Sequence, residues 1–152
     1  MTHTALRTAA VASLAFVAGL AVARLPLPAR AASAPLQPAV IDLAALTPDD
    51  LPTPTPASPK LRSKLLVSAD GATGQIQIGT VFKHYHADAN EIQIVISGSG
   101  TEWLGDKQVT LKPGTMLTIP AGTPHAGTTD PNLKIVAFKT PPQAATDVHP
   151  IP

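Results

Sequence analysis

Residues 84–98 read HYHADANEIQIVISG, and this stretch decides the fold. On a β-strand, successive side chains point to opposite faces, so His84 and His86 share one face and Tyr85 takes the other. A short turn follows, and the next alternating run opens with Glu91, which brings a carboxylate beside the two imidazoles. The stretch therefore predicts two strands joined by a turn, with three side chains able to bind metal near that turn.

Residues 114–125 read GTMLTIPAGTPH and end on a third imidazole, His125. A lone His-x-His pair is more often a solvated pair than a metal site. Here, however, three of the five histidines fall in these two stretches, and glycines and prolines that force tight corners surround each. Three neutral nitrogens and one carboxylate suit Mn, Fe, Co, Ni, Cu or Zn, whereas Ca and Mg prefer all-oxygen shells. We therefore expect His84, His86, Glu91 and His125 to bind one divalent transition metal ion.

The two stretches resemble the two sequence motifs of the cupin family. The first reads His84-x-His86, four residues, Glu91, six residues, Gly98. The second reads Gly114, five residues, Pro120-Ala-Gly122, two residues, His125, and 15 residues lie between the motifs. Two positions depart from the family pattern at corners of the chain: Gly79 lies one residue closer to the first histidine than usual, and Thr129 replaces a frequent asparagine.

The resemblance covers residues 60–140 and implies an all-β fold. This fold is the cupin double-stranded β-helix, an antiparallel jelly-roll barrel of six to eight strands. It is commonly a homodimer, with the metal near the interior of the barrel. The same fold serves oxygenases, isomerases, lyases, sugar binders and storage proteins, so the resemblance settles no reaction.

The rest of the chain after residue 60 agrees with this fold class. Short β-rich runs alternate with turns, and the Gly105-Asp106 pair predicts a two-residue hairpin between residues 102–104 and 107–111. Seven or so short strands and no long helix indicate an antiparallel barrel or sandwich. Because hydrophobic residues make up 44% of the chain and aromatic residues only 3%, we expect a small core built from Ile, Val, Leu and Ala.

Strand parity extends the predicted pocket outward from the ligands. We expect five side chains to line it: Ile78, Thr80, Phe82, Gln93 and Val95. This lining is nearly aprotic, since parity adds no Asp, Lys, Tyr or Arg to it, although Gln93 could orient a ligand. A metal-bound water or dioxygen would then do most of the chemistry on a small, anionic, chelating substrate.

Three function classes remain open from the sequence. The first is a metal-dependent enzyme with dioxygenase-like or related chemistry, such as an oxygenase, isomerase or lyase. The second is a non-catalytic protein that binds a small molecule or a metal, and the third is a barrel with a vestigial site. Beyond the first thirty residues, eight Lys and Arg face ten Asp and Glu, so no basic stripe predicts binding to nucleic acid or to a membrane surface.

The N-terminal residues 1–31 predict a secretory signal peptide. A basic-polar start ends at Arg7, an apolar run spans residues 8–23, and Ala29-Arg30-Ala31 has the small-x-small pattern of a cleavage site. An uncleaved membrane anchor and a cytoplasmic helix are the alternatives. The absence of cysteine and of an Arg-Arg pair leaves the general secretory route. We expect a periplasmic or secreted protein with no stable membrane anchor after cleavage.

The segments that flank the predicted barrel are rich in proline. Residues 32–59 contain seven prolines and form either a disordered spacer or an arm that packs on the barrel or on a partner subunit. Residues 141–152 predict a flexible tail, and neither His3 nor His149 is assigned a role. On the outward face of the 91–97 run, Ile92, Ile94 and Ile96 need cover from a second sheet or a partner, which predicts a homodimer.

Overall fold

The computed structural model describes residues 35–69 and 71–152. The predicted signal peptide, residues 1–31, lies outside the described residues. Within the part of the chain that is described, no helix is long and apolar enough to cross a membrane.

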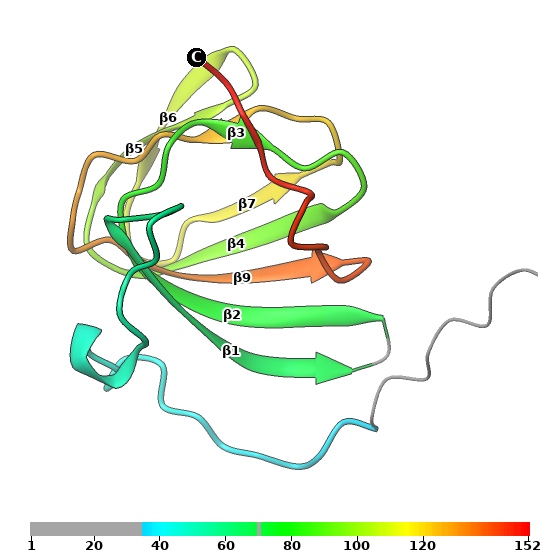
Figure 1. The fold of residues 1–152 in the computed structure, drawn as a ribbon. Helices are drawn as coiled ribbons and strands as arrows, with labels where there is room; N and C mark the ends of the chain where they lie inside the picture. The colour runs from blue at the N-terminus through cyan, green and yellow to red at the C-terminus, as the bar shows by residue number, and fades with distance from the viewer. Residues whose placement is uncertain (1–34, 70) are drawn as a thin grey trace, which may run out of the picture. The chain divides into compact units, whose positions relative to one another are not determined.

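The described part of the chain folds into ten β-strands and one short 3-10 helix, η1 (Pro48–Asp50). The strands are β1 (Leu61–Ala69), β2 (Ala72–Gly79), β3 (His84–Tyr85), β4 (Asn90–Ser97), β5 (Gly100–Leu104), β6 (Lys107–Leu111), β7 (Met116–Ile119), β8 (His125–Ala126), β9 (Lys134–Thr140) and β10 (His149–Pro150). They form two five-stranded sheets with the orders β1-β2-β9-β4-β7 and β10-β3-β8-β5-β6 (Figure 1). Every pairing between these strands is antiparallel, which confirms the predicted jelly-roll fold class.

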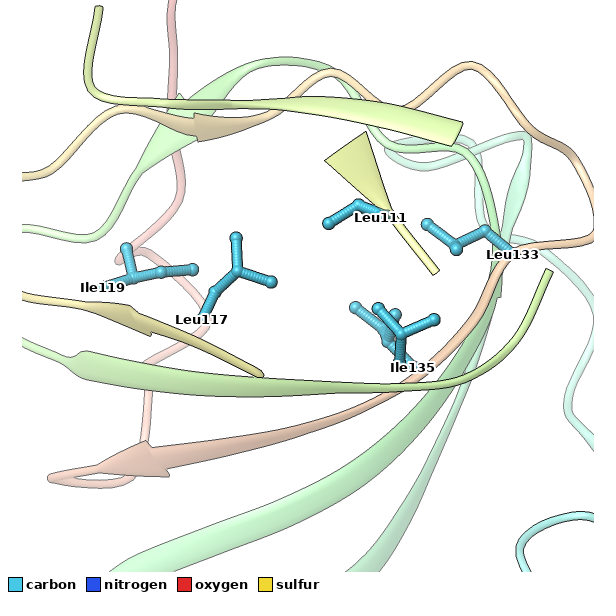
Figure 2. Close-up of a cluster of buried hydrophobic side chains, with 6 residues drawn as sticks. Leu111, Leu117, Ile119, Leu133 and Ile135 are labelled. Atoms are coloured by element: carbon cyan, nitrogen blue, oxygen red, sulfur yellow. The ribbon is translucent and has the colours of Figure 1, made fainter. Parts of the chain in front are cut away.

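One apolar core joins the two sheets. Its buried members are Val95, Leu111, Leu117, Ile119, Leu133 and Ile135 (Figure 2). Partly buried Leu104 and Val109 pack against it from the second sheet. The core contains only Val, Leu and Ile, as the low aromatic content predicts.

The predicted hairpin at Gly105-Asp106 is confirmed. Leu104 pairs with Lys107 across it, so two residues make the turn between β5 and β6. Gly105 has a φ of 62°, in the left-handed region that glycine enters at no steric cost.

A second apolar cluster lies on the other face of the first sheet, where the Pro-rich arm covers it. Leu51 of the arm is 4% exposed and is buried together with Ile76, Ile78 and Val136. Leu43 and Leu46 pack against the same cluster. Of the two alternatives for residues 32–59, the structure therefore shows an arm that packs on the barrel over residues 43–51.

A buried lysine fixes the arm in place. Lys134 of β9 is 8% exposed, and its Nζ donates hydrogen bonds to the main-chain carbonyls of Leu43, Ala44 and Leu46. Burial of an ammonium group is costly unless its donors are satisfied, and here three carbonyls accept from it. The arm thus provides both an apolar cover and the acceptors for a buried charge.

The outward isoleucines of β4 are covered only in part. Ile96 packs against the cluster beneath the arm, whereas Ile92 is 40% exposed and its cross-strand neighbour Phe138 is 41% exposed. The homodimer expected from this face stays a prediction.

The C-terminal residues differ from the expected flexible tail. His149 and Pro150 form β10, which pairs with Tyr85 and His84 of β3. This contact could not be predicted from the sequence, because a two-residue strand that contains a proline has no alternating pattern of its own.

We predict that Leu51→Ala lowers the free energy of unfolding by about 2–4 kcal/mol, because it removes buried methyl groups and leaves a cavity. Urea denaturation of the metal-free protein measures the loss. Leu36→Ala is the matched control, since Leu36 is 61% exposed in the same arm and its truncation should change stability by less than about 0.5 kcal/mol. Equal effects of the two variants would contradict a packed arm.

Candidate metal centre

Three histidines, on two short strands and directly after one of them, meet at one point inside the fold. His84 pairs directly with His125 across β3 and β8, and His86 follows β3 by one residue. The ring centroids are 4.5 Å apart for His84 and His125, 4.9 Å for His84 and His86, and 5.2 Å for His86 and His125. One nitrogen of each ring lies within 4.8 Å of the others, so the three residues could hold a metal ion.

Main-chain carbonyls set the tautomer of each ring. A carbonyl oxygen can only accept, so the ring nitrogen that faces it must carry the proton. In all three rings this nitrogen is Nδ1, and the acceptors are Phe82 for His84 (2.9 Å), Thr123 for His125 (2.9 Å) and Asp147 for His86. Each neutral ring therefore keeps its lone pair on Nε2, as metal-ligating histidines do when a second partner orients them.

Glu91 brings a carboxylate to the same point. Its Oε2 lies 3.1 Å from Nε2 of His86 and 3.3 Å from Nε2 of His125. Its other oxygen, Oε1, accepts a hydrogen bond of 3.0 Å from Nε2 of Gln93. Burial alone would raise the pKa of Glu91, but the His125 and His86 imidazoles and the Lys139 amine outweigh it and hold that pKa well below its usual range.

This donor set fits a divalent transition metal. With Nδ1 protonated, Nε2 of His86 and Oε2 of Glu91 are both acceptors, and two acceptors at 3.1 Å need a cation or an extra proton between them. Nε2 of His125 is buried and has no hydrogen-bond partner. Burial also lowers the pKa of His84 to about 4, so this ring is neutral and free to bind metal at neutral pH.

Two of the three histidines, His84 and His86, open into a cavity of about 270 Å³. His84, His86 and Glu91 line it, and two of the predicted lining residues, Phe82 and Gln93, do so as well. Its polar lining is otherwise made of amide, hydroxyl and amine groups, among them Gln75, Gln77, Gln143, Ser63 and Lys139.

Three predicted lining residues lie elsewhere. Ile78 is buried in the apolar cluster beneath the arm, Val95 is buried in the core between the sheets, and Thr80 lines a neighbouring pocket. The prediction for Ile78 and Thr80 was wrong because parity holds only along a continuous strand, and β2 ends at Gly79. Gly79 has a φ of 120°, and a Cβ there would lie 2.1 Å from the Lys60 carbonyl oxygen, so the chain turns at this residue.

Val95 shows a different error. It does share the inward face of β4 with Glu91 and Gln93, as the alternation predicts, and all three are buried. It lies further along the strand than the cavity reaches, and there it packs against Leu117 and Ile135.

A sequence model of the cupin domain family matches residues 73–137, which contain the two histidine strands and Glu91. This chain carries a cupin domain. A search of curated proteins found no significant match.

Solved structures of low identity share the fold of this cupin domain. KdgF from Halomonas sp. is 18% identical, with a TM-score of 0.51 over 57% of this chain and 85% of that chain. A variant of Streptomyces PAC13, solved with uridine, is 16% identical, with a TM-score of 0.53 over 70% of this chain and 88% of that chain. At these identities the likeness concerns the fold and not the ligand.

The cavity beside His84, His86 and Glu91, here called the cupin pocket, contains an amine that was not predicted from the sequence. Lys139 of β9 is 5% exposed, lies 3.6 Å from Oε2 of Glu91 through its Nζ, and donates a hydrogen bond to Oε1 of Gln143. The expectation of a lining without lysine was therefore wrong. The register pairs Glu91 with Lys139 across β4 and β9, and alternation with buried Ile135 and Ala137 could have pointed to it.

A second missed group, Glu102 of β5, lies behind the cupin pocket. It is 1% exposed, and neither of its carboxylate oxygens has a hydrogen-bond partner. Glu102 lines a small cavity together with Gln77 and Gln93, which also line the cavity of about 270 Å³. Oε1 of Gln93 is likewise buried and has no hydrogen-bond partner. Burial raises the pKa of Glu102 to about 7.

We predict that replacement of His125 or of Glu91, two of the four proposed ligands, weakens metal binding by about tenfold or more. His125→Ala removes an imidazole, and Glu91→Gln removes the anionic oxygen while it keeps the shape of the side chain. Elemental analysis after dialysis and competition with a chromophoric chelator give the stoichiometry and the affinity. Asp106→Ala, at the exposed hairpin turn, is the control, and unchanged metal content in both ligand variants would exclude these residues as ligands.

We predict that Glu102→Gln stabilises the metal-free protein above pH 7 by up to about 3 kcal/mol. The pKa of about 7 in the folded state exceeds the ordinary glutamate pKa of 4.5, so the folded state binds the proton more tightly and the wild type loses stability as pH rises from about 4.5 to 7. Glutamine cannot ionise, so this loss should vanish in the variant. Urea denaturation at pH 4.5 and pH 8 measures it, and an equal difference between the two proteins at both pH values would refute the buried charge.

Proposed function

We propose that this protein is an exported, metal-dependent cupin enzyme that acts on a small, polar, anionic ligand. His84, His86, His125 and Glu91 would hold one divalent transition metal ion. The observation that carries the proposal is the composition of one cavity, in which His84, His86 and Glu91 share the lining with Lys139 and several glutamines.

The charges of the proposed site favour an anion. The imidazoles are neutral when they bind metal, and Glu91 supplies one negative charge against the two positive charges of a divalent ion. The buried ammonium of Lys139 adds a positive charge 3.6 Å from Oε2 of Glu91. The site would therefore remain net positive and would attract a carboxylate or a similar anionic group.

The amide and hydroxyl groups of the cavity favour a ligand with several polar atoms. Gln75, Gln77 and Gln143 can each donate and accept hydrogen bonds, and Ser63 can do both through its hydroxyl. When bound, a divalent ion would polarise a ligand oxygen as a Lewis acid. The side chains of the pocket would fix the orientation of the ligand, and Phe82 would cover part of it from water.

Glu102 supports catalysis over binding alone. General acids and bases work best when their pKa lies near the operating pH, and burial raises the pKa of Glu102 to about 7. Perturbed carboxyl groups next to a pocket are typical of active sites. Glu102 would exchange a proton with a ligand that reaches past Gln93, in oxygenase, isomerase or lyase chemistry.

We predict that metal-loaded protein turns over at least one compound in a panel of small hydroxylated carboxylates. Mass spectrometry of the products and an oxygen electrode detect the reaction. For an active compound, Lys139→Met should raise KM by about tenfold, because it removes the positive charge that attracts the anion, while metal content stays unchanged. Lys107→Met, on the exposed end of β6, is the matched control.

The outcomes separate the candidate functions. Binding of a compound without turnover would favour a non-catalytic binding protein. Ligands that are all neutral, or an unchanged KM in Lys139→Met, would contradict an anionic substrate.

A further inference from the structure

Residues 149–151, near the C-terminus, lie along residues 83–85, which include His84. His149 pairs with Tyr85, and the two rings stack with centroids 4.8 Å apart. Pro150 pairs with His84, and the N–H of Ile151 donates a hydrogen bond of 3.0 Å to the carbonyl of Lys83. We call residues 144–151 the C-terminal clamp.

Within the clamp, the carboxylate of Asp147 holds the turn that joins two of the proposed ligands. Asp147 is 3% exposed, and its oxygens accept hydrogen bonds from three consecutive N–H groups, at 2.6 Å from Ala87, 3.3 Å from Asp88 and 3.2 Å from Ala89. These residues connect His86 to the start of β4. A turn fixed at three successive N–H groups has little freedom, so the spacing between the His86 ring and the Glu91 carboxylate is fixed as well.

The main chain of the same residue orients the ring of His86. The carbonyl of Asp147 accepts the hydrogen bond from Nδ1 of His86, which keeps the proton on Nδ1 and leaves the lone pair on Nε2. For the other two histidines, the equivalent carbonyl comes from two residues upstream in the chain, Phe82 and Thr123. His86 alone among the three takes its orienting acceptor from a distant segment.

We propose that Asp147 is a positioning residue for the metal centre and that the C-terminal clamp is a structural part of that centre. The inference rests on the proposed metal site at His84, His86, His125 and Glu91. With the clamp in place, Nε2 of His86 and Oε2 of Glu91 are held in the geometry that binds the ion. Without it, the His86 ring can turn and the 87–90 turn can relax, so the ion binds more weakly.

The test compares the metal affinity of full-length protein with that of three variants at the clamp. Asp147→Ala removes the carboxylate, Asp147→Asn keeps one oxygen as an acceptor, and a chain that ends at Thr146 removes the carbonyl as well. The probes are Zn²⁺, by competition with a chromophoric chelator, and Co²⁺, whose visible absorption reports the geometry of its ligands. Urea denaturation of each metal-free protein measures the stability of the fold separately.

Asp130→Ala is the matched control. Asp130 is also a loop carboxylate that accepts two main-chain hydrogen bonds, from Ser99 at 3.1 Å and from Asn132 at 2.8 Å, but it contacts none of the proposed ligands. Its loss should reduce stability without a change in the Co²⁺ spectrum.

We expect Asp147→Ala to weaken Zn²⁺ binding by about 10- to 100-fold, the usual effect of losing a group that orients a metal ligand. Asp147→Asn should lie between Asp147→Ala and the wild type, and the shortened chain should bind most weakly and show an altered Co²⁺ spectrum. Equal affinity in wild type and Asp147→Ala, or an equal loss in Asp147→Ala and Asp130→Ala, would overturn the role of Asp147. Absence of metal binding by the wild type would instead refute the proposed function.

Discussion

The structure depends on one electrostatic constraint, the meeting of buried acceptor atoms at a single point. One strand pairing and one turn produce it: β3 against β8 sets His84 opposite His125, and the turn after His86 returns the chain to Glu91. Buried lone pairs and a buried carboxylate are costly unless a cation or a donor lies among them. Two neighbouring groups partly compensate the charge of Glu91: the Lys139 amine lies close to its carboxylate, and the Gln93 amide donates a hydrogen bond to it. The acceptors that remain, the Nε2 atoms of the histidines, fit a metal ion.

Strand β9 shows how the first sheet contacts the barrel interior with one face and the Pro-rich arm with the other. Its inward residues Ile135 and Ala137 fill the interior and lead to Lys139 in the pocket. Its outward residues Lys134 and Val136 face the arm, where three carbonyls accept from Lys134. Residues 134–137 of this strand are therefore buried on both faces, and each face of the strand has one buried lysine with its own set of acceptors.

The sequence predicted the parts of the site that depend on local geometry. The His84 and His86 pair follows from strand alternation, and the jelly-roll class follows from short runs separated by turns. Parity failed for Ile78 because the chain turns at Gly79, where a side chain would clash with the Lys60 carbonyl.

Long-range register was beyond the sequence analysis. Lys139 and Asp147 reach the site only through pairings between segments far apart in the chain, β9 with β4 and β10 with β3. One sequence shows which residues alternate along a strand, but it does not show which strand lies beside it. The signal peptide, the bound metal and the homodimer remain predictions from the sequence.

The topology also has a consequence for the order of assembly. Strand β9 lies between β2 and β4 in the first sheet, so this sheet cannot close until residues 134–140 are available. The ring of His86 gains its orienting carbonyl later still, from Asp147 near the end of the chain. Folds dominated by such distant pairings form slowly, after loop closure has been overcome. During synthesis, the two histidines of β3 and its flank would thus emerge well before the residues that shape them into a binding site, and a metal ion would find the complete site only at one of the last steps of folding.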